Sequence, residues 1–221
     1  NYKLLQENIS LLGIESTVMA ENIAVWKEDG NVELNISQSS NLHSIHNKGA
    51  GNTISIPAVS VSSFLKDKKS PSFIKMDVEG AEVEIFEGMK NFVLDTKHTI
   101  KILVELHPNY YSDHHSFTPQ LEWYFKNGFK AKYLISATVA EPDFFSKKSF
   151  KPVEKYSMGG YSRGLYENLD INTIVEAINN EEPQKFYPPT RLNRVLSFFG
   201  LPTKHDYTNK IVRGLLLVRE C

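Results

Sequence analysis

Hydrophobic and polar residues follow the clearest pattern in the middle of the chain. Residues 72–77 form a short apolar run, which is typical of a buried strand. Over 81–94 apolar side chains recur at helical spacing, and 100–106 is a second apolar run. The order of strand, helix and strand predicts two parallel neighbouring strands, as in an open α/β sheet that binds ligands at the carboxyl ends of its strands.

The flanking segments predict further helices and strands. Helices are expected over 2–12, 118–127, 172–180 and 190–199, and strands over 17–26, 32–37, 54–61, 129–136 and 211–218. Residues 38–53 are rich in Ser, Asn, His and Gly, a composition that predicts a mobile loop.

Local turn and cap residues refine these expectations. The Asp29-Gly30 pair predicts a hairpin between the first two strands. Pro57 predicts that the third strand lies at an edge or bends, because proline cannot donate to a ladder. Ser62 or Ser63 is expected to cap a short helix that follows this strand.

Composition limits the classes of protein that need to be considered. The 221 residues can form one domain with a sizeable core, and 41% of them are hydrophobic. A formal net charge of −1 argues against a nucleic-acid surface, and no apolar run is long enough for a membrane span. Because Cys221 is the single cysteine, a disulfide within the chain is excluded, which favours a reducing, cytoplasmic location.

Polar residues follow each strand of the central unit, where ligands would bind. Asp77 and Glu79 come at the end of the first strand, and Glu105 and His107 at the end of the second. Because parallel neighbours end at the same edge of a sheet, these four side chains are expected to face one crevice. His107 is the candidate general base, since its ordinary pKa lies near neutrality.

Each of these residues also has a purely structural interpretation. Asp77 and Glu79 can cap the following helix, Glu105 can pair with a lysine, and His107 can bond to the backbone. Metal binding by Asp77, Glu79 and His107 is a further alternative, because carboxylates suit hard cations.

Two other patterns carry less chemistry. Adjacent histidines in Asp113-His114-His115 resemble a metal cluster, but they are expected to be merely exposed because no recognisable ligand spacing completes them. A phosphate-binding glycine loop with its lysine is also missing from the sequence.

Three phrases resemble one known family. Residues 74–82, Ile-Lys-Met-Asp-Val-Glu-Gly-Ala-Glu, closely resemble the signature of the FkbM family of S-adenosylmethionine-dependent methyltransferases. Residues 102–108, Ile-Leu-Val-Glu-Leu-His-Pro, are similar to the next strand of that family. A weaker likeness lies in Asn8-Ile9 and in 24–30, so that the resemblance spans roughly 1–136.

This resemblance implies a fold and an activity. The fold would be α/β, a class I methyltransferase (Rossmann-like) with a mostly parallel sheet and an antiparallel edge hairpin made by 129–136 and 211–218. S-adenosylmethionine would be the cofactor, and the acceptor a hydroxyl of a sugar, another glycan or a small metabolite. At the two strand ends, Asp77, Glu79, Glu105 and His107 fit the layout that catalysis of methyl transfer needs. The resemblance places cofactor contacts near Asn22, Ala24 and Asp77.

The start of the chain departs from the family pattern. Neither the glycine-rich cofactor loop nor the acid that follows the second strand is found, and Gly49-Ala-Gly51 lacks the strand and helix that the motif needs. The fold is therefore expected to be N-terminally incomplete, so that these residues alone bind the cofactor weakly and tend to self-associate. A non-catalytic binding or scaffold domain remains the main alternative, and a dinucleotide-using oxidoreductase a weaker one.

Residues 1–221 are expected to form a single domain interrupted at about 138–209. This long insertion is rich in Pro, Phe and Tyr. An insertion of this length is typical of a lid or an acceptor-binding element, although a structural subdomain is the alternative. Phe144, Phe145, Tyr156 and Tyr161 are its candidate contact residues.

Overall fold

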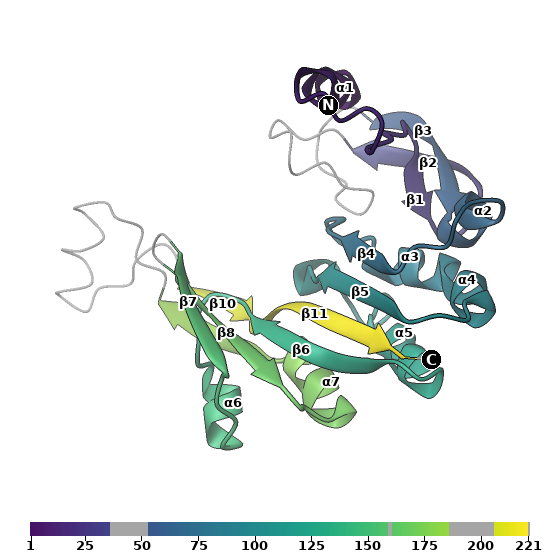
Figure 1. Cartoon of the computed structure of the whole chain (residues 1–221). Helices are drawn as coiled ribbons and strands as arrows, with labels where there is room; N and C mark the ends of the chain where they lie inside the picture. Colours follow the sequence, from purple (N-terminus) through teal and green to yellow (C-terminus); the bar gives the residue numbers. More distant parts are fainter. Residues whose placement is uncertain (36–52, 159–160, 186–205, 221) are drawn as a thin grey trace, which may run out of the picture. The chain divides into compact units, whose positions relative to one another are not determined.

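The computed structural model describes residues 1–35, 53–158, 161–185 and 206–220, which form two compact units (Figure 1). Unit 1 consists of Asn1–Pro71, Val78–Lys97 and Tyr110–Gln120, and unit 2 of Ser72–Asp77, His98–Asn109 and Leu121–Cys221. The expected helix over 190–199 and nearly all of the expected loop over 38–53, including Gly49-Ala-Gly51, lie outside the described residues.

Unit 1 is built on a three-stranded sheet with the order β1-β3-β2. Its strands are β1 Ala24–Trp26, β2 Gly30–Asn35 and β3 Thr53–Ser60. Its helices are α1 Tyr2–Leu11, α2 Val61–Leu65, α3 Glu82–Gly88 and α4 Lys90–Asp95. The central strand β3 runs parallel to β1 and antiparallel to β2.

The strand order shows that the hairpin predicted from Asp29-Gly30 is wrong, because β3 lies between β1 and β2. The Asp29 carboxylate instead accepts a hydrogen bond of 2.9 Å from the backbone N–H of Ser60, at the end of β3. Pro57 lies in the central strand rather than an edge strand. It pairs with Asn31 of β2, but the ladder with β1 begins only at Ala58, so the missing N–H of proline breaks no bond there.

A serine side chain explains why the helix expected over 81–94 is divided in two. The Ser62 hydroxyl donates to the carbonyl of Gly88 at 2.7 Å and accepts from the N–H of Phe92 at 3.1 Å. These two backbone groups would otherwise bond to each other within one helix, and an inserted side chain separates them. Ser62 is therefore not the cap of α2. That role belongs to Ser60, whose hydroxyl accepts from the N–H of Ser63.

Unit 2 is built on a six-stranded sheet with the order β4-β5-β11-β6-β8-β7. Its strands are β4 Phe73–Met76, β5 Ile100–Glu105, β6 Lys130–Ser136, β7 Glu154–Met158, β8 Tyr161–Glu167 and β11 Val212–Arg219. The remaining elements after β5 are the 3-10 helix η1 Pro108–Tyr110, the helices α5 Thr118–Lys126, α6 Asp143–Lys147 and α7 Ile171–Asn179, and the strand pair β9 Glu181–Lys185 and β10 Asp206–Lys210.

The pairing confirms two predictions and corrects a third. β4 and β5 are parallel, and β11 pairs antiparallel with β6, as expected. β11 does not lie at an edge, however, because it is inserted between β5 and β6 and the sheet continues through β8 and β7. Among the described strands only β4–β5 and β1–β3 pair in parallel, so the α/β fold has mixed rather than mostly parallel sheets.

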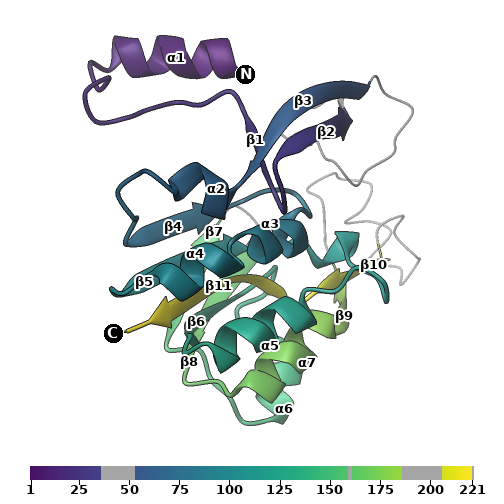
Figure 2. The ribbon, with the colours of Figure 1, turned by 90° about the vertical axis from the view of Figure 1, so that its right-hand side faces the viewer.

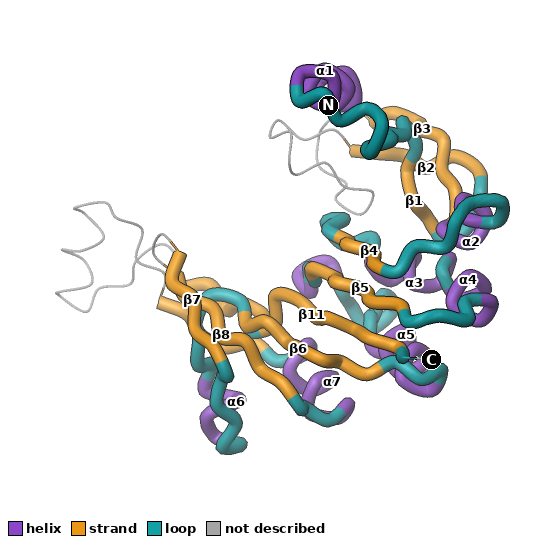
Figure 3. The backbone as a smooth tube through the Cα atoms, viewed as in Figure 1, coloured by secondary structure: helices purple, strands orange, loops and turns teal. Residues whose placement is uncertain are grey.

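Helices α5 and α7 lie beside the six-stranded sheet (Figure 3), and α5 buries Leu121 and Tyr124. Figure 1 and Figure 2 show α5 and α7 on the same face of this sheet. α7 begins at the cap Asp170, whose carboxylate accepts from Thr173 N–H, and buries Ile174 and Ile178. None of the described helices is long and apolar enough to cross a membrane.

The insertion contributes strands and buried side chains to unit 2 rather than only covering its surface. Its strands β7 and β8 extend the main sheet, and Phe145 is fully buried with its ring stacked at 4.3 Å on that of Tyr166. Phe145 is therefore not available as a contact surface for a ligand. Tyr156 remains exposed, and the side chain of Tyr161 lies outside the described residues.

Replacing Ser62 by alanine is expected to lower the free energy of unfolding by about 1–3 kcal/mol, because Gly88 and Phe92 each lose a partner for a backbone group. The matched control is Ser63→Ala in the same helix, where the side chain is exposed and the expected change is within about 0.5 kcal/mol. Urea unfolding followed by circular dichroism measures both. Equal midpoints for the two variants would contradict the bridging role of Ser62.

Candidate functional site

A buried histidine and an accessible aspartate meet at the ends of the two parallel strands of unit 2. β4 and β5 are in register with Met76 opposite Val104, so Asp77 and His107 follow at the same edge. The imidazole Nε2 of His107 lies 3.6 Å from Oδ1 of Asp77, and the two side chains are 7% and 40% exposed. This pair can hold and release a proton beside an open surface.

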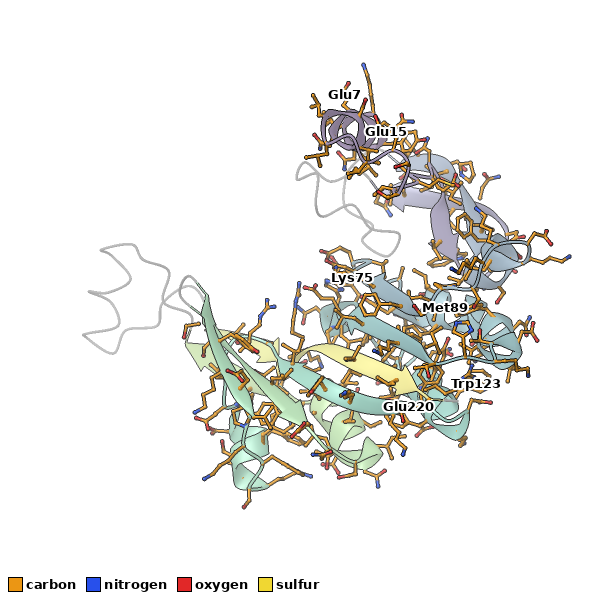
Figure 4. All side chains as sticks on the ribbon, viewed as in Figure 1. Glu7, Glu15, Lys75, Met89, Trp123 and Glu220 are labelled. Atoms are coloured by element: carbon orange, nitrogen blue, oxygen red, sulfur yellow. The ribbon has the colours of Figure 1, made fainter. Side chains whose placement is uncertain are left out.

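Asp77 has a second charged neighbour on its own strand. The Lys75 ammonium lies 3.6 Å from Oδ2 of Asp77, and both side chains are exposed; Figure 4 labels Lys75 on β4. An exposed pair of this kind adds little to stability because solvent screens it. The Asp77 carboxylate thus stays accessible to a ligand.

Glu105 is engaged by the neighbouring strand. Its carboxylate forms an ion pair with the Arg213 guanidinium of β11, and both side chains are half-buried. The same pair of strands is joined by a 2.7 Å bond from Leu106 N–H to the Arg213 carbonyl. The partner of Glu105 is thus an arginine rather than the expected lysine. This ion pair gives Glu105 a structural role that requires no catalysis. A catalytic role for Glu105 stays a prediction.

The turn after Asp77 adopts an uncommon backbone conformation. In the turn Val78–Ala81, closed by a 3.3 Å bond from Ala81 N–H to the Val78 carbonyl, φ is +47° at Glu79 and +98° at Gly80. Positive φ at both central residues is typical of a type I′ turn and costs a residue with a side chain about 1–2 kcal/mol. Gly80 is required here, because a Cβ atom would lie 2.6 Å from the Tyr110 ring.

Tyr110 closes over this turn in unit 1. Burial, together with the negative charges of Glu79 and Glu82, raises the pKa of the Tyr110 hydroxyl. The tyrosine therefore keeps its proton at neutral pH and presents a neutral ring to Gly80.

Glu82 was not among the site residues predicted from the sequence. It lies in the first turn of α3, and it is fully buried. One carboxylate oxygen accepts from Gly80 N–H at 3.2 Å, and the other accepts from the Tyr111 hydroxyl at 3.1 Å. Its place three and four residues before the buried Ile85 and Phe86 was the sequence feature that indicated burial.

His115 is also less exposed than expected. Its Nε2 lies 3.0 Å from a carboxylate oxygen of Glu84 on α3, and its Nδ1 lies 3.0 Å from the Tyr110 carbonyl. Asp113 and His114 are exposed, as predicted. His115 therefore fastens the segment after η1 to α3 within unit 1.

The other candidate ligand-binding residues are divided between the units. Asn22 is exposed, and Ala24 is the half-buried first residue of β1, both in unit 1, whereas Asp77 belongs to unit 2. The metal alternative likewise draws on Asp77 and His107 of unit 2 and on Glu79 of unit 1. Both the cofactor set and the metal alternative stay predictions.

Comparison with known proteins identifies one family. The sequence model of the Methyltransferase FkbM domain matches residues 1–131, which include the phrases at 74–82 and 102–108. This match confirms the family expected from the sequence. Searches of curated proteins and of solved structures give no match.

The left-handed backbone at Glu79 can be tested with a matched pair of substitutions. Glu79→Gly is expected to be more stable than Glu79→Ala by about 1 kcal/mol, because glycine adopts positive φ without strain and alanine does not. Both variants lack the carboxylate, so any loss of activity that they share reports on the side chain alone. Thermal unfolding measures the difference, and a more stable alanine variant would contradict the strained turn.

Proposed function

The chain belongs to the FkbM family of methyltransferases, and from this premise we propose that it transfers a methyl group from S-adenosylmethionine to a hydroxyl of a sugar, another glycan or a small metabolite. The observation that carries the proposal is the approach of buried His107 to Asp77 at the ends of neighbouring parallel strands. A buried imidazole beside a carboxylate is suited to take the proton that a hydroxyl must lose.

The sheet of unit 2 supports the class I methyltransferase fold that the family implies. Its parallel strands β4 and β5 are followed in the sheet by β11, which runs antiparallel to both β5 and β6. The family resemblance leads to the same pairing of the last strand. The strands that the insertion adds extend this arrangement without interrupting it.

Bound S-adenosylmethionine would supply a methyl group already activated by the positive charge on its sulfur. The accessible Asp77 carboxylate fits such a cation by its charge, and Glu79 offers a second carboxylate of the same kind. Asn22 and Ala24 are the further residues that the resemblance assigns to the cofactor. The contribution of the chain is to bind and orient the cofactor and its acceptor, because correct alignment of the reacting atoms removes much of the activation barrier.

In this proposal His107 acts as the general base. Because its Nε2 is buried beside Asp77, the proton of the acceptor hydroxyl reaches that nitrogen through the accessible Asp77 carboxylate, which then stabilises the imidazolium that results. Burial of the ring keeps bulk water away from the imidazole, while the Asp77 carboxylate stays partly exposed. Once the product leaves, the proton returns to solvent through the exposed side of Asp77.

We also propose that the insertion at 138–209 contacts the acceptor. The exposed Tyr156 and the half-buried Phe144 provide aromatic surface, which suits sugars and apolar ligands. Removal of whole segments is a poor test, because β7 and β8 belong to the main sheet. Single substitutions on the exposed side of β7 are more informative.

Asp77→Asn and His107→Ala are each expected to lower methyl transfer by about 100- to 10,000-fold, the usual contribution of a general base and the group that supports it. Asp113→Asn and His114→Ala are the matched controls, because they remove the same groups from an exposed segment. Transfer of radiolabelled methyl from S-adenosylmethionine to a panel of hydroxylated acceptors is the measurement, with calorimetry of cofactor binding beside it. Wild-type rates in both site variants would leave these residues a structural role, and binding without transfer in the wild type would favour the non-catalytic domain.

Tyr156→Ala is expected to raise the KM for the acceptor by about three- to tenfold and to leave the KM for the cofactor unchanged, because an aromatic contact contributes about 0.5–1.5 kcal/mol. Ser157→Ala, on the opposite face of the same strand, is the control. Steady-state kinetics with each substrate varied in turn separates the two constants. An unchanged acceptor KM in Tyr156→Ala would contradict the contact.

A further inference from the structure

The turn that carries Glu79 needs support from elsewhere in unit 1. Its two central residues have φ of +47° and +98°, and the first of them is not glycine. Such a conformation persists only where surrounding contacts over-determine it. The contact within the turn itself, from Ala81 N–H to the Val78 carbonyl, is long at 3.3 Å.

The Glu82 carboxylate supplies that support. It accepts the backbone N–H of Gly80, the second left-handed residue, at 3.2 Å. A helix-capping acid is usually solvated, whereas Glu82 is 0% exposed. Burying a carboxylate is costly unless hydrogen bonds satisfy it, and the Tyr111 hydroxyl donates the second bond, at 3.1 Å.

The Tyr111 ring is held by aromatic contacts, which fix the position of the hydroxyl that donates to Glu82. Its ring stacks on Phe117 with centroids 6.1 Å apart and planes 14° apart, and Phe117 packs edge-on against Phe86 of α3 at 4.8 Å. The imidazole of His115 contacts the Tyr111 ring edge-on, with centroids 5.9 Å apart, and its Nε2 lies within hydrogen-bond distance of Glu84 on α3. The segment after η1 and the first turn of α3 thus form one braced assembly.

We propose that Glu82 is a positioning residue for methyl transfer: its buried carboxylate, oriented by Tyr111, fixes the Gly80 N–H and thereby the direction of the Glu79 carboxylate. The role rests on the proposed function, because it matters for the rate only if Glu79 faces the reacting groups. Glu82 acts through the backbone of the turn and has no contact with a substrate in this proposal.

Two near-isosteric substitutions separate the hydrogen bond from the charge. Glu82→Gln removes the charge but keeps a carbonyl oxygen for Gly80 N–H, and its amide can donate to the Tyr111 hydroxyl, which can also accept. Glu82→Met fills the same space and removes both acceptors. Glu87→Met is the matched control on the exposed face of α3, and Tyr111→Phe removes the orienting hydroxyl alone.

Amide hydrogen exchange of Gly80 by NMR and steady-state kinetics are measured on each variant and on the wild type. In Glu82→Met, Gly80 exchange is expected to rise about ten- to 100-fold, since a bond to a charged group is lost. A misdirected side chain is expected to lower kcat about ten- to 100-fold with little change in the acceptor KM. Glu82→Gln should stay within about threefold of the wild type on both measures, and Tyr111→Phe should lie between the two.

Equal losses in the Gln and Met variants would overturn the proposal, because the charge rather than the hydrogen bond would then matter. Faster Gly80 exchange with a wild-type kcat in Glu82→Met would overturn it as well, since the turn would be freed without consequence. A wild-type protein that transfers no methyl group would overturn the proposed function and the positioning role together. Transfer by the wild type with unchanged Gly80 exchange in Glu82→Met would overturn the positioning role alone.

Discussion

Parallel pairing of β4 with β5 is the constraint on which the candidate site depends. Two strands that run the same way end at one edge, so residues far apart in the chain follow them into the same place. With Met76 opposite Val104, the register leaves Asp77 and His107 within 3.6 Å of each other. β11 secures β5 from its other side, partly through the ion pair of Arg213 with Glu105. A slip of one residue in either pairing would turn these side chains to the opposite face of the sheet.

Much of unit 2 was predictable because its strands are short apolar runs with unambiguous boundaries. The strands β4 and β5 and the helix α7 follow from patterns local to each segment, whereas the pairing of β11 with β6 was expected from the family resemblance. The insertion was harder, because its aromatic residues do not reveal which of them face the core. Phe145 and Tyr156 look alike in the sequence, yet the first is fully buried and the second is exposed.

The structure of unit 1 differs more from the sequence-based predictions. Each difference comes from a contact between segments that lie far apart in the sequence. Asp29-Gly30 specifies a turn but not the partner of the strand that follows, and β3 takes the position that a hairpin would have filled. Ser62 divides a helix from which it is separated by more than 20 residues of sequence, a contact that no local pattern contains. The burial of Glu82 was readable from its spacing to Ile85, but the hydroxyl of Tyr111 that makes its burial tolerable was not.

The left-handed backbone at Glu79 also limits the amino acids that this position can accept. Glycine, asparagine and aspartate enter the αL region readily, whereas valine, isoleucine and threonine are penalised there by their branched Cβ atoms. A library of all substitutions at Glu79, selected only for folded protein, would thus be sorted by backbone geometry before any chemistry is tested. Asparagine and aspartate would be the informative survivors, because both keep the turn. Aspartate retains the carboxylate on a side chain shorter by one methylene, and asparagine replaces it with an amide. The backbone angle φ thus decides which amino acids position 79 can accept, and the carboxylate decides whether the residue there can serve the proposed reaction.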